Sequence, residues 1–366
     1  MNHDWIKQTF TAGVPLLLAT ATSLAADPSS LDQPPTEEKN HFRAAYRMAF
    51  NINASFKNIG AMGSPGHIVP NQGLQLANPG PATGGGINRT YEDGYNWVDS
   101  TGNSFGYTRY WGYDSSSQLV GNSIVMHSTS SAGASSMNRS DDPSPGFELT
   151  YARELLHRGR MRGGIETTFG YTALNIKDTR ALMASGSRIN DAYALPPSSD
   201  GGFVIPPPAP YSGQFELQPN GNAVISDAPT RTTDTVIETV AGRREFTADI
   251  YGLKIGPYLD LELGRFTLGL SGGFVLAYVD SKLDVLSNIS AGGIPTTASE
   301  AGSRNEFLPG AYVAGNISYA LSKNWSVFGS GQFQDAGKYY QRAKTARAAL
   351  DLSQTVFLAL GASYSF

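Results

Sequence analysis

The sequence predicts an all-β protein: a transmembrane antiparallel up-and-down β-barrel of eight strands, with ten strands as the alternative. Three observations predict it. Apolar and polar residues alternate with a period of two over long stretches, long and short connections alternate along the chain, and the chain ends in a strand whose last residue is aromatic. Only every second residue of a barrel strand needs to be apolar, so such strands escape a search for long apolar runs.

Composition narrows the classes of function. The 366 residues include no cysteine, which excludes disulfides, thiol nucleophiles and thiolate metal sites. The formal charge of −4 argues against a nucleic-acid partner, because such proteins usually carry a basic face. No cofactor and no metal site are expected.

The N-terminus has the features of an export signal. Residues 13–19 form a short apolar run, and small residues at 23–26 provide a cleavage site, although Lys7 is the only basic side chain before them. We therefore predict a signal peptide at 1–26, a polar periplasmic linker at 27–40, and a single barrel domain at 41–366.

Residues 41–57 predict the first strand. Even positions from Phe42 to Phe56 are apolar, whereas odd positions include Arg43, Arg47 and Lys57. A helix would spread these basic residues around its circumference, whereas a strand places them all on one face. We expect one continuous strand, with lipid on the even face and a polar lumen on the odd face.

Residues 58–146 are rich in Gly, Ser, Asn and Pro and predict a long loop. Two segments, 91–99 and 107–114, carry aromatic residues among acids. They favour a hairpin with aromatic cross-strand pairs, or alternatively a sugar-stacking surface or a Ca²⁺ site. Residues 118–128 contain strand-forming side chains, and a membrane strand here would raise the count from eight to ten.

A hairpin with a short turn follows at residues 147–173. Phe147, Leu149 and Tyr151 share one face of its first strand, with Glu148 and Glu154 on the other. The second strand places Arg162 and Glu166 opposite its apolar residues. Residues 178–243 predict another long loop, because Pro206, Pro207 and Pro208 cannot donate ladder hydrogen bonds.

Residues 244–263 predict a strand whose pattern changes phase. Odd positions from Leu253 to Leu263 are apolar, and Lys254, Asp260 and Glu262 occupy even positions. Phe246, Ala248 and Ile250 are also even, so we expect a bulge near Gly252.

The remaining segments alternate turns, strands and loops. Short turns at 264–265 and 322–324 separate strands that begin near Phe266, Phe307 and Trp325. A medium loop is expected at 284–304. A basic loop with Lys338, Arg342, Lys344 and Arg347 precedes the final strand.

The final strand, residues 353–366, is apolar at even positions and mostly small or hydroxylated at odd ones. Gly361, Tyr364 and Phe366 resemble the C-terminal β-signal of bacterial outer-membrane β-barrel proteins. This resemblance implies that the strand closes the barrel, that the barrel-assembly machinery reads it, and that the protein resides in the bacterial outer membrane.

The order of connections predicts the architecture. Alternation of long and short connections places short turns in the periplasm and the long loops at 58–146 and 178–243 outside the cell. The mature chain therefore resembles the small opacity/adhesin-type (OmpA-like) outer-membrane barrels. The expected partners are outer-membrane lipid, the assembly machinery and an unidentified extracellular ligand; the oligomeric state stays open.

The inward positions predict a charge network in the lumen. Its members are Arg43, Arg47, Glu148, Glu154, Arg162, Glu166, Lys254, Asp260 and Glu262. Buried charges need partners, so their mixed signs predict a salt-bridged, largely closed lumen and a structural or surface-binding role through the loops. The alternatives are a small porin for hydrophilic solutes and a lipid-modifying enzyme. The enzyme alternative depends on His127-Ser128, which lacks the His-x-Ser-Asn arrangement of lipid A deacylases, and no enzymatic activity is expected.

Overall fold

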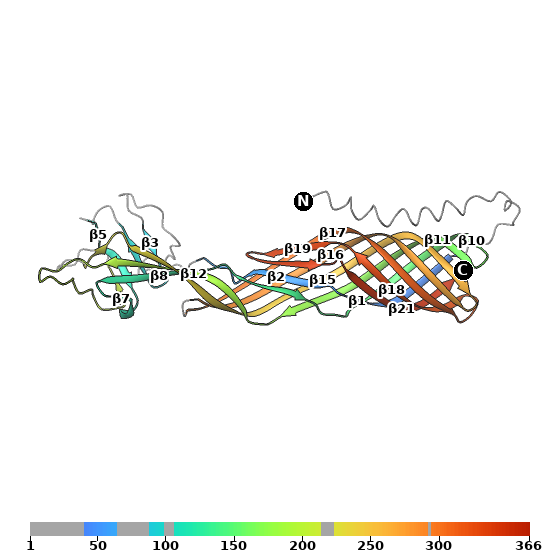
Figure 1. Ribbon diagram of the computed structural model, residues 1–366, viewed down its shortest axis with the longest axis horizontal. Coiled ribbons are helices and arrows are strands. Elements are labelled where there is room, and N and C mark those ends of the chain that lie inside the picture. The colour runs from blue at the N-terminus through green and yellow to red at the C-terminus, as the bar shows by residue number, and fades with distance from the viewer. Residues whose placement is uncertain (1–39, 64–87, 99–105, 214–222, 292–293) are drawn as a thin grey trace.

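Figure 1 shows a computed structural model, which describes residues 40–63, 88–98, 106–213, 223–291 and 294–366. Its regular structure is β-strand apart from a short 3-10 turn, Ser116–Gln118. The predicted signal peptide and all but the last residue of the predicted linker lie outside the described residues. Among the described residues, no helix has the length and apolar character needed to cross a membrane.

The main sheet is antiparallel and closes on itself. Its closed ring runs in the order β11-β10-β1-β21-β18-β17-β16-β15, and β15 pairs in turn with β11. The strands of the ring are β1 (Asn40–Phe50), β10 (Ser144–Arg158), β11 (Met161–Asp178), β15 (Thr230–Leu263), β16 (Phe266–Ala291), β17 (Ile294–Ala320), β18 (Trp325–Asp335) and β21 (Thr355–Ser365).

A second group of strands continues the ring away from the C-terminus. A separate sheet has the order β19-β20-β2-β9, and β12 pairs with β15 above the end of β11. These strands are β2 (Asn53–Ile59), β9 (Ala134–Arg139), β12 (Leu182–Ala194), β19 (Lys338–Ala343) and β20 (Ala346–Asp351).

The remaining strands build a head at the end of the molecule farthest from the C-terminus (Figure 1). They are β3 (Arg89–Thr90), β4 (Gly94–Trp97), β5 (Tyr107–Thr108), β6 (Tyr110–Tyr113), β7 (Leu119–Val120), β8 (Ser123–Ser131), β13 (Tyr211–Ser212) and β14 (Ile225–Ser226). The long strands β12 and β15 and the shorter β8 connect the head to the closed sheet. The three short turns, which join β10 to β11, β15 to β16 and β17 to β18, lie at the opposite end.

An aromatic row crosses six neighbouring strands on the outer face. Consecutive members are direct cross-strand neighbours: Tyr46, Phe147, Tyr171, Tyr251, Tyr278 and Phe307. We call the part of the closed sheet between this row and the short turns the lower section, and the part between the row and the head the upper section.

The lower section is apolar outside and polar inside. On β15, Leu253, Ile255, Leu259 and Leu261 are exposed on the outer face. Between them, Lys254, Tyr258 and Asp260 are buried in the lumen. This is the alternation that the sequence predicts for strands with lipid on one side and a polar lumen on the other.

The upper section reverses this arrangement. Its interior is one apolar cluster, in which Phe56, Phe246, Leu283, Tyr339 and Leu350 each have 0% exposure. Most side chains on its outer face are charged or polar, although Leu286 and Tyr340 are exposed there too. The upper section is therefore built like a water-soluble protein, with a packed hydrophobic core.

The first strand differs from its prediction. It is interrupted at Asn51, whose positive φ of 62° separates β1 from β2. Beyond that residue Ile52, Ala54 and Phe56 turn inward, and Lys57 becomes exposed. The apolar residues stay on even positions because the backbone reverses its faces at the same level at which the section changes.

The prediction of a bulge near Gly252 is wrong. The pairing of β11 with β15 runs without a shift from Met161↔Leu261 to Asp178↔Arg244. Even residues of β15 face inward on both sides of Gly252. The pattern changes because the surroundings reverse between the sections, while the backbone keeps its phase.

The predicted loops contain strands. Segment 58–146 holds most of the head together with β8 and β9, and 178–243 holds β12 and the start of β15. The medium loop at 284–304 is instead the paired ends of β16 and β17. The basic loop is the hairpin β19–β20. The strand within 118–128 is β8, which pairs with β7 and β12 outside the closed ring.

Candidate functional site

The predicted charge network lies on four consecutive strands of the ring, β1, β10, β11 and β15. Inward positions alternate along each strand, so residues an even number of positions apart face the same lumen. Each of the nine predicted side chains pairs with at least one other member.

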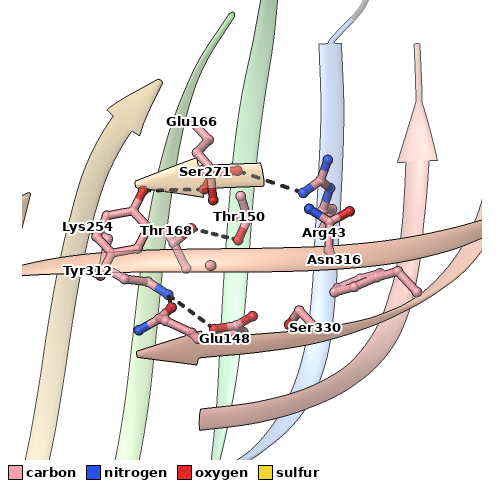
Figure 2. Close-up of a pocket in the computed structure, with 13 residues that line it drawn as sticks. Arg43, Glu148, Thr150, Glu166, Thr168, Lys254, Ser271, Tyr312, Asn316 and Ser330 are labelled. Atoms are coloured by element: carbon pink, nitrogen blue, oxygen red, sulfur yellow. Dashed lines mark hydrogen bonds and ion pairs between the residues drawn. The ribbon is translucent and has the colours of Figure 1, made fainter. Parts of the chain in front are cut away.

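Two carboxylates bracket the Arg43 guanidinium at the centre of the network. Its nitrogens lie 3.7 Å from Glu166 and 3.5 Å from Asp260. On the neighbouring level, Glu148 Oε2 lies 3.4 Å from Lys254 Nζ and 3.9 Å from Arg47 Nη1. Figure 2 shows Arg43 directed at Glu166 and Lys254 directed at Glu148 across the lumen.

A further cluster lies near the short turns. Arg162 is 2.8 Å from Glu262 and 3.9 Å from Glu154. Glu154 Oε1 also lies 3.0 Å from His157 Nδ1, and Glu154 Oε2 lies 3.9 Å from His41 Nε2. His157, beside the short turn between β10 and β11, therefore takes part in the network.

Neutral side chains complete the network, and the sequence pattern did not single them out as partners. The Tyr312 hydroxyl donates to Glu166, Arg47 donates to Thr172 at 2.7 Å, and Lys254 donates to Gln332. The Arg47 guanidinium also lies 4.4 Å from the centre of the Phe357 ring. Phe357 occupies an odd, inward position among small residues in β21, and this position could have identified it from the sequence as a partner of the network.

The centre of the network encloses a small cavity. A cavity of about 30 Å³ lies among Arg43, Glu148, Glu166, Lys254 and Tyr312 (Figure 2). At roughly 10–15 Å³ per water, it holds about two water molecules. Above it, the apolar cluster of the upper section fills the interior.

The β-signal residues lie on the seam between β21 and β1. A side chain at Gly361 would overlap the backbone of Ala44 and Ala45, so only glycine fits this position. Tyr364 lies on the outer face between Phe42 and Trp325, its direct cross-strand neighbours. Phe366 exchanges two backbone hydrogen bonds of 2.9 Å with Asn40.

The aromatic residues of segments 91–99 and 107–114 are mostly core residues of the head. β4 pairs with β6, and Tyr95, Trp97, Trp111 and Tyr113 are buried. Between these two strands only Trp97, opposite Tyr110, forms a direct cross-strand aromatic pair, whereas Tyr95, Trp111 and Tyr113 lie opposite Gly112, Asn96 and Gly94. The buried rings are not available as a sugar-stacking surface. Among the described residues, no group of three or more His, Cys, Asp or Glu side chains is arranged to hold a metal ion.

A buried polar cluster fixes the start of the head onto β12. Arg231 donates two 2.7 Å hydrogen bonds to Asp191, which also accepts one from the Tyr91 hydroxyl. The Tyr91 and Tyr193 hydroxyls are 2.6 Å apart. Burial raises the pKa of Tyr193 to about 12, so both phenols stay protonated and the cluster persists at physiological pH.

His127 has a structural partner. Its Nδ1 lies 2.5 Å from Asp93, and its backbone N–H donates to the same carboxylate at 2.8 Å. Glu92 accepts a hydrogen bond from the backbone N–H of Thr129 in the same way. The two acids thus cover the free edge of β8, which protects it from pairing with another strand.

No family model and no curated protein matches the sequence significantly. The solved structures that match this chain include Ail, the attachment invasion locus protein of Yersinia pestis. It is 10% identical, with a TM-score of 0.26, and the match covers 90% of this chain and 100% of Ail. The outer membrane protease OmpT of Escherichia coli is 10% identical, with a TM-score of 0.31 and coverage of 91% and 98%. A Pseudomonas aeruginosa FadL homologue is 9% identical, with a TM-score of 0.18 and coverage of 89% and 90%. These values are too low to assign the activity or ligand of any of them to this chain.

Proposed function

We propose that the chain is an outer-membrane protein with a closed lumen, whose function is to hold the head at a distance from the cell surface for binding. In this proposal the eight strands of the ring cross the membrane through the lower section. The short turns lie in the periplasm, and the upper section and head lie outside the cell. Outer-membrane lipid and the barrel-assembly machinery are the expected partners.

The dimensions of the lower section support a membrane location. On β16, Phe266 near the short turn and Tyr278 in the aromatic row are twelve residues apart. At about 3.3 Å per residue and a tilt of about 45°, they are separated by roughly 28 Å along the membrane normal, close to the roughly 25 Å apolar band of outer-membrane barrels. The outer face between them is apolar, with Leu268, Leu270, Phe274 and Leu276 exposed.

The filling of the interior at two successive levels carries the proposal. An aqueous channel would have to pass the ion pairs of the lower section and then the fully buried apolar cluster of the upper section. Opening the second barrier would expose a hydrophobic core to water. This disfavours the porin alternative and favours a role carried by the head.

Planar bilayer recording tests this function. The purified full-length protein should insert and give no discrete conductance steps. Stable single-channel steps of uniform size would contradict the closed lumen. As a positive control for the method, a porin should conduct in the same bilayers.

Assembly provides a second test, which addresses the membrane location. Phe366→Asp should lower the amount of heat-modifiable protein in the outer membrane, because it places a charge in the β-signal. Tyr340→Asp changes an equally exposed aromatic residue of the upper section and serves as the matched control. Equal yields of both variants would argue against the β-signal assignment.

A further inference from the structure

The hairpin β19–β20 and the neighbouring strand β2 carry a row of basic residues. Arg342 is the direct cross-strand neighbour of Arg347, and Arg347 is that of Lys57. All three side chains are exposed on the outer face of the upper section. Lys344 lies in the turn of the same hairpin and is also exposed. We call these four residues the basic row.

Like charges directly opposite each other destabilise a sheet. Within the part of the chain that the structure describes, no member of the basic row forms an ion pair. The other exposed basic side chains on this surface do form them: Lys177 and Arg243 with Glu245, Lys282 with Asp284, Arg304 with Glu306, and Lys338 with Asp351. The basic row is therefore an exception on a surface that otherwise neutralises its charges locally.

The hairpin is held in place by groups that leave the row free. Both carboxylate oxygens of Glu300 accept hydrogen bonds from the turn, from the N–H groups of Thr345 and Ala346 and the Thr345 hydroxyl. Lys344 adopts a positive φ of 50° at this turn. Glu300 is therefore engaged with the backbone, and the positions of Arg342 and Arg347 are fixed before any partner binds.

The height of the row points to its partner. Phe333, Val356 and Phe50 are direct cross-strand neighbours and form the last outward apolar row on the same side of the barrel. The basic row lies seven to nine residues beyond it along the connected strands, at a height of roughly 16–21 Å for about 3.3 Å per residue and a tilt of about 45°. Figure 1 shows β19 and β2 between the head and the lower section. This is the layer of lipid headgroups and attached sugars.

We infer that the basic row binds phosphate groups on the saccharide headgroups of the lipids that surround the barrel in the outer leaflet. Four cations on a fixed surface, facing sideways just above the hydrocarbon, match a layer of fixed anions. Arginine binds phosphate through two parallel hydrogen bonds, and two of the four residues are arginines. The inference rests on the proposed membrane location.

The test uses purified full-length protein in detergent, with fluorescent lipopolysaccharide as the probe, either native or dephosphorylated. The test variant combines Lys57→Gln, Arg342→Gln, Lys344→Gln and Arg347→Gln. The control combines Lys177→Gln, Arg243→Gln, Lys282→Gln and Arg304→Gln, which removes the same charge from ion-paired positions. The test variant should bind native lipopolysaccharide at least about tenfold more weakly than the wild type, and the control within about twofold.

Dephosphorylated lipopolysaccharide should bind the wild type as weakly as the native form binds the test variant. Equal losses in the two variants, or unchanged binding after dephosphorylation, would overturn the inference. Tighter binding of a soluble sulfated oligosaccharide would also overturn it, because the row would then serve a free polyanion. Normal heat-modifiable mobility of a variant shows that weaker binding is not caused by misfolding. Insertion of the wild type into the outer membrane tests the proposed function separately from the binding of lipopolysaccharide.

Discussion

The lower and upper sections share one continuous ring of hydrogen bonds but place their apolar side chains on opposite faces: outside in the lower section and inside in the upper section. Below the aromatic row, Lys254 and Asp260 face inward and Leu253 and Leu259 face outward. Above it on the same strand, Phe246 faces inward among apolar residues. The comparison teaches that the same continuous backbone can present either its inner or its outer face as the apolar one.

The chain achieves this reversal in two ways. Three neighbouring pairs, β1–β2, β18–β19 and β20–β21, switch the inward parity at an interruption near the top of the lower section. β15 and β16 continue without interruption and instead change which parity is apolar. Four predictions test this arrangement of apolar and polar side chains in the two sections, in order of decreasing loss of stability.

The largest effect is expected from a charge in the upper interior. Phe246→Asp removes a fully buried ring and places an unpaired carboxylate in the apolar cluster, at a cost of more than about 5 kcal/mol. Limited proteolysis should then cut the upper section while the lower section stays protected. Thr247→Asp, on the opposite face beside Lys282, is the control and should stay resistant. Resistance of Phe246→Asp would show that this interior is not a packed core.

The next effect concerns an ion cluster at the boundary between β11 and β12. Asp178 is buried beside Arg244, Arg180 and Arg139. Burial opposes its ionisation, but hydrogen bonds from Arg180 and Ser136 and the charge of Arg244 outweigh burial and hold the pKa of Asp178 well below its usual value. Asp178→Asn should cost about 3–5 kcal/mol at pH 7, because it leaves Arg244 buried without a counter-charge.

This contribution depends on pH in a defined direction. A carboxylate with a lowered pKa in the folded state stabilises the fold above its unfolded pKa of about 3.9, and the stabilisation is lost as pH falls below it. Urea unfolding in detergent should therefore show the difference between wild type and Asp178→Asn shrinking below about pH 4. A constant difference across that range would show that the charge of Asp178 is not what stabilises the cluster.

A charge on the outer face sharpens the comparison directly. Leu270→Arg, midway along the lower section, should cost about 2–4 kcal/mol in lipid bilayers. Ile237→Arg, at an exposed apolar residue of the upper section, should stay within about 0.5 kcal/mol. Unfolding titrations in bilayers measure both. Equal costs would mean that the two surfaces meet the same medium.

The smallest effect is expected at the interruption of the first strand. Asn51→Ala forces alanine into the left-handed region and removes a 2.9 Å hydrogen bond to the Gln354 carbonyl, for a loss of about 1–2 kcal/mol. Asn51→Gly keeps the backbone conformation and should lose less. If glycine is as damaging as alanine, the loss comes from the side-chain bond, which both variants remove, and not from the backbone conformation.

The sequence predicted the lower section well because an apolar outer face and a polar lumen give a long, regular alternation. The pairing of Arg43 and Lys254 with acids follows from the same alternation. The upper section escaped prediction because its outward positions carry many Gly, Ser, Thr and Asn residues, which are typical of loops too. The sequence pattern could not show that the backbone reverses its faces at Asn51 but keeps its phase in β15. An apolar pattern fits both a backbone interruption and a change in which face of the strand is apolar.

The two-way hydrogen bonding of Asn40 with Phe366 has a consequence for biogenesis. These residues lie on the seam at which the ring closes, so closure requires both β1 and β21. A chain lacking its last strand would keep β1 and β18 as two unpaired edges, which invite aggregation. Late closure of the ring, in a single step that joins its first and last strands, is therefore built into the order of the strands.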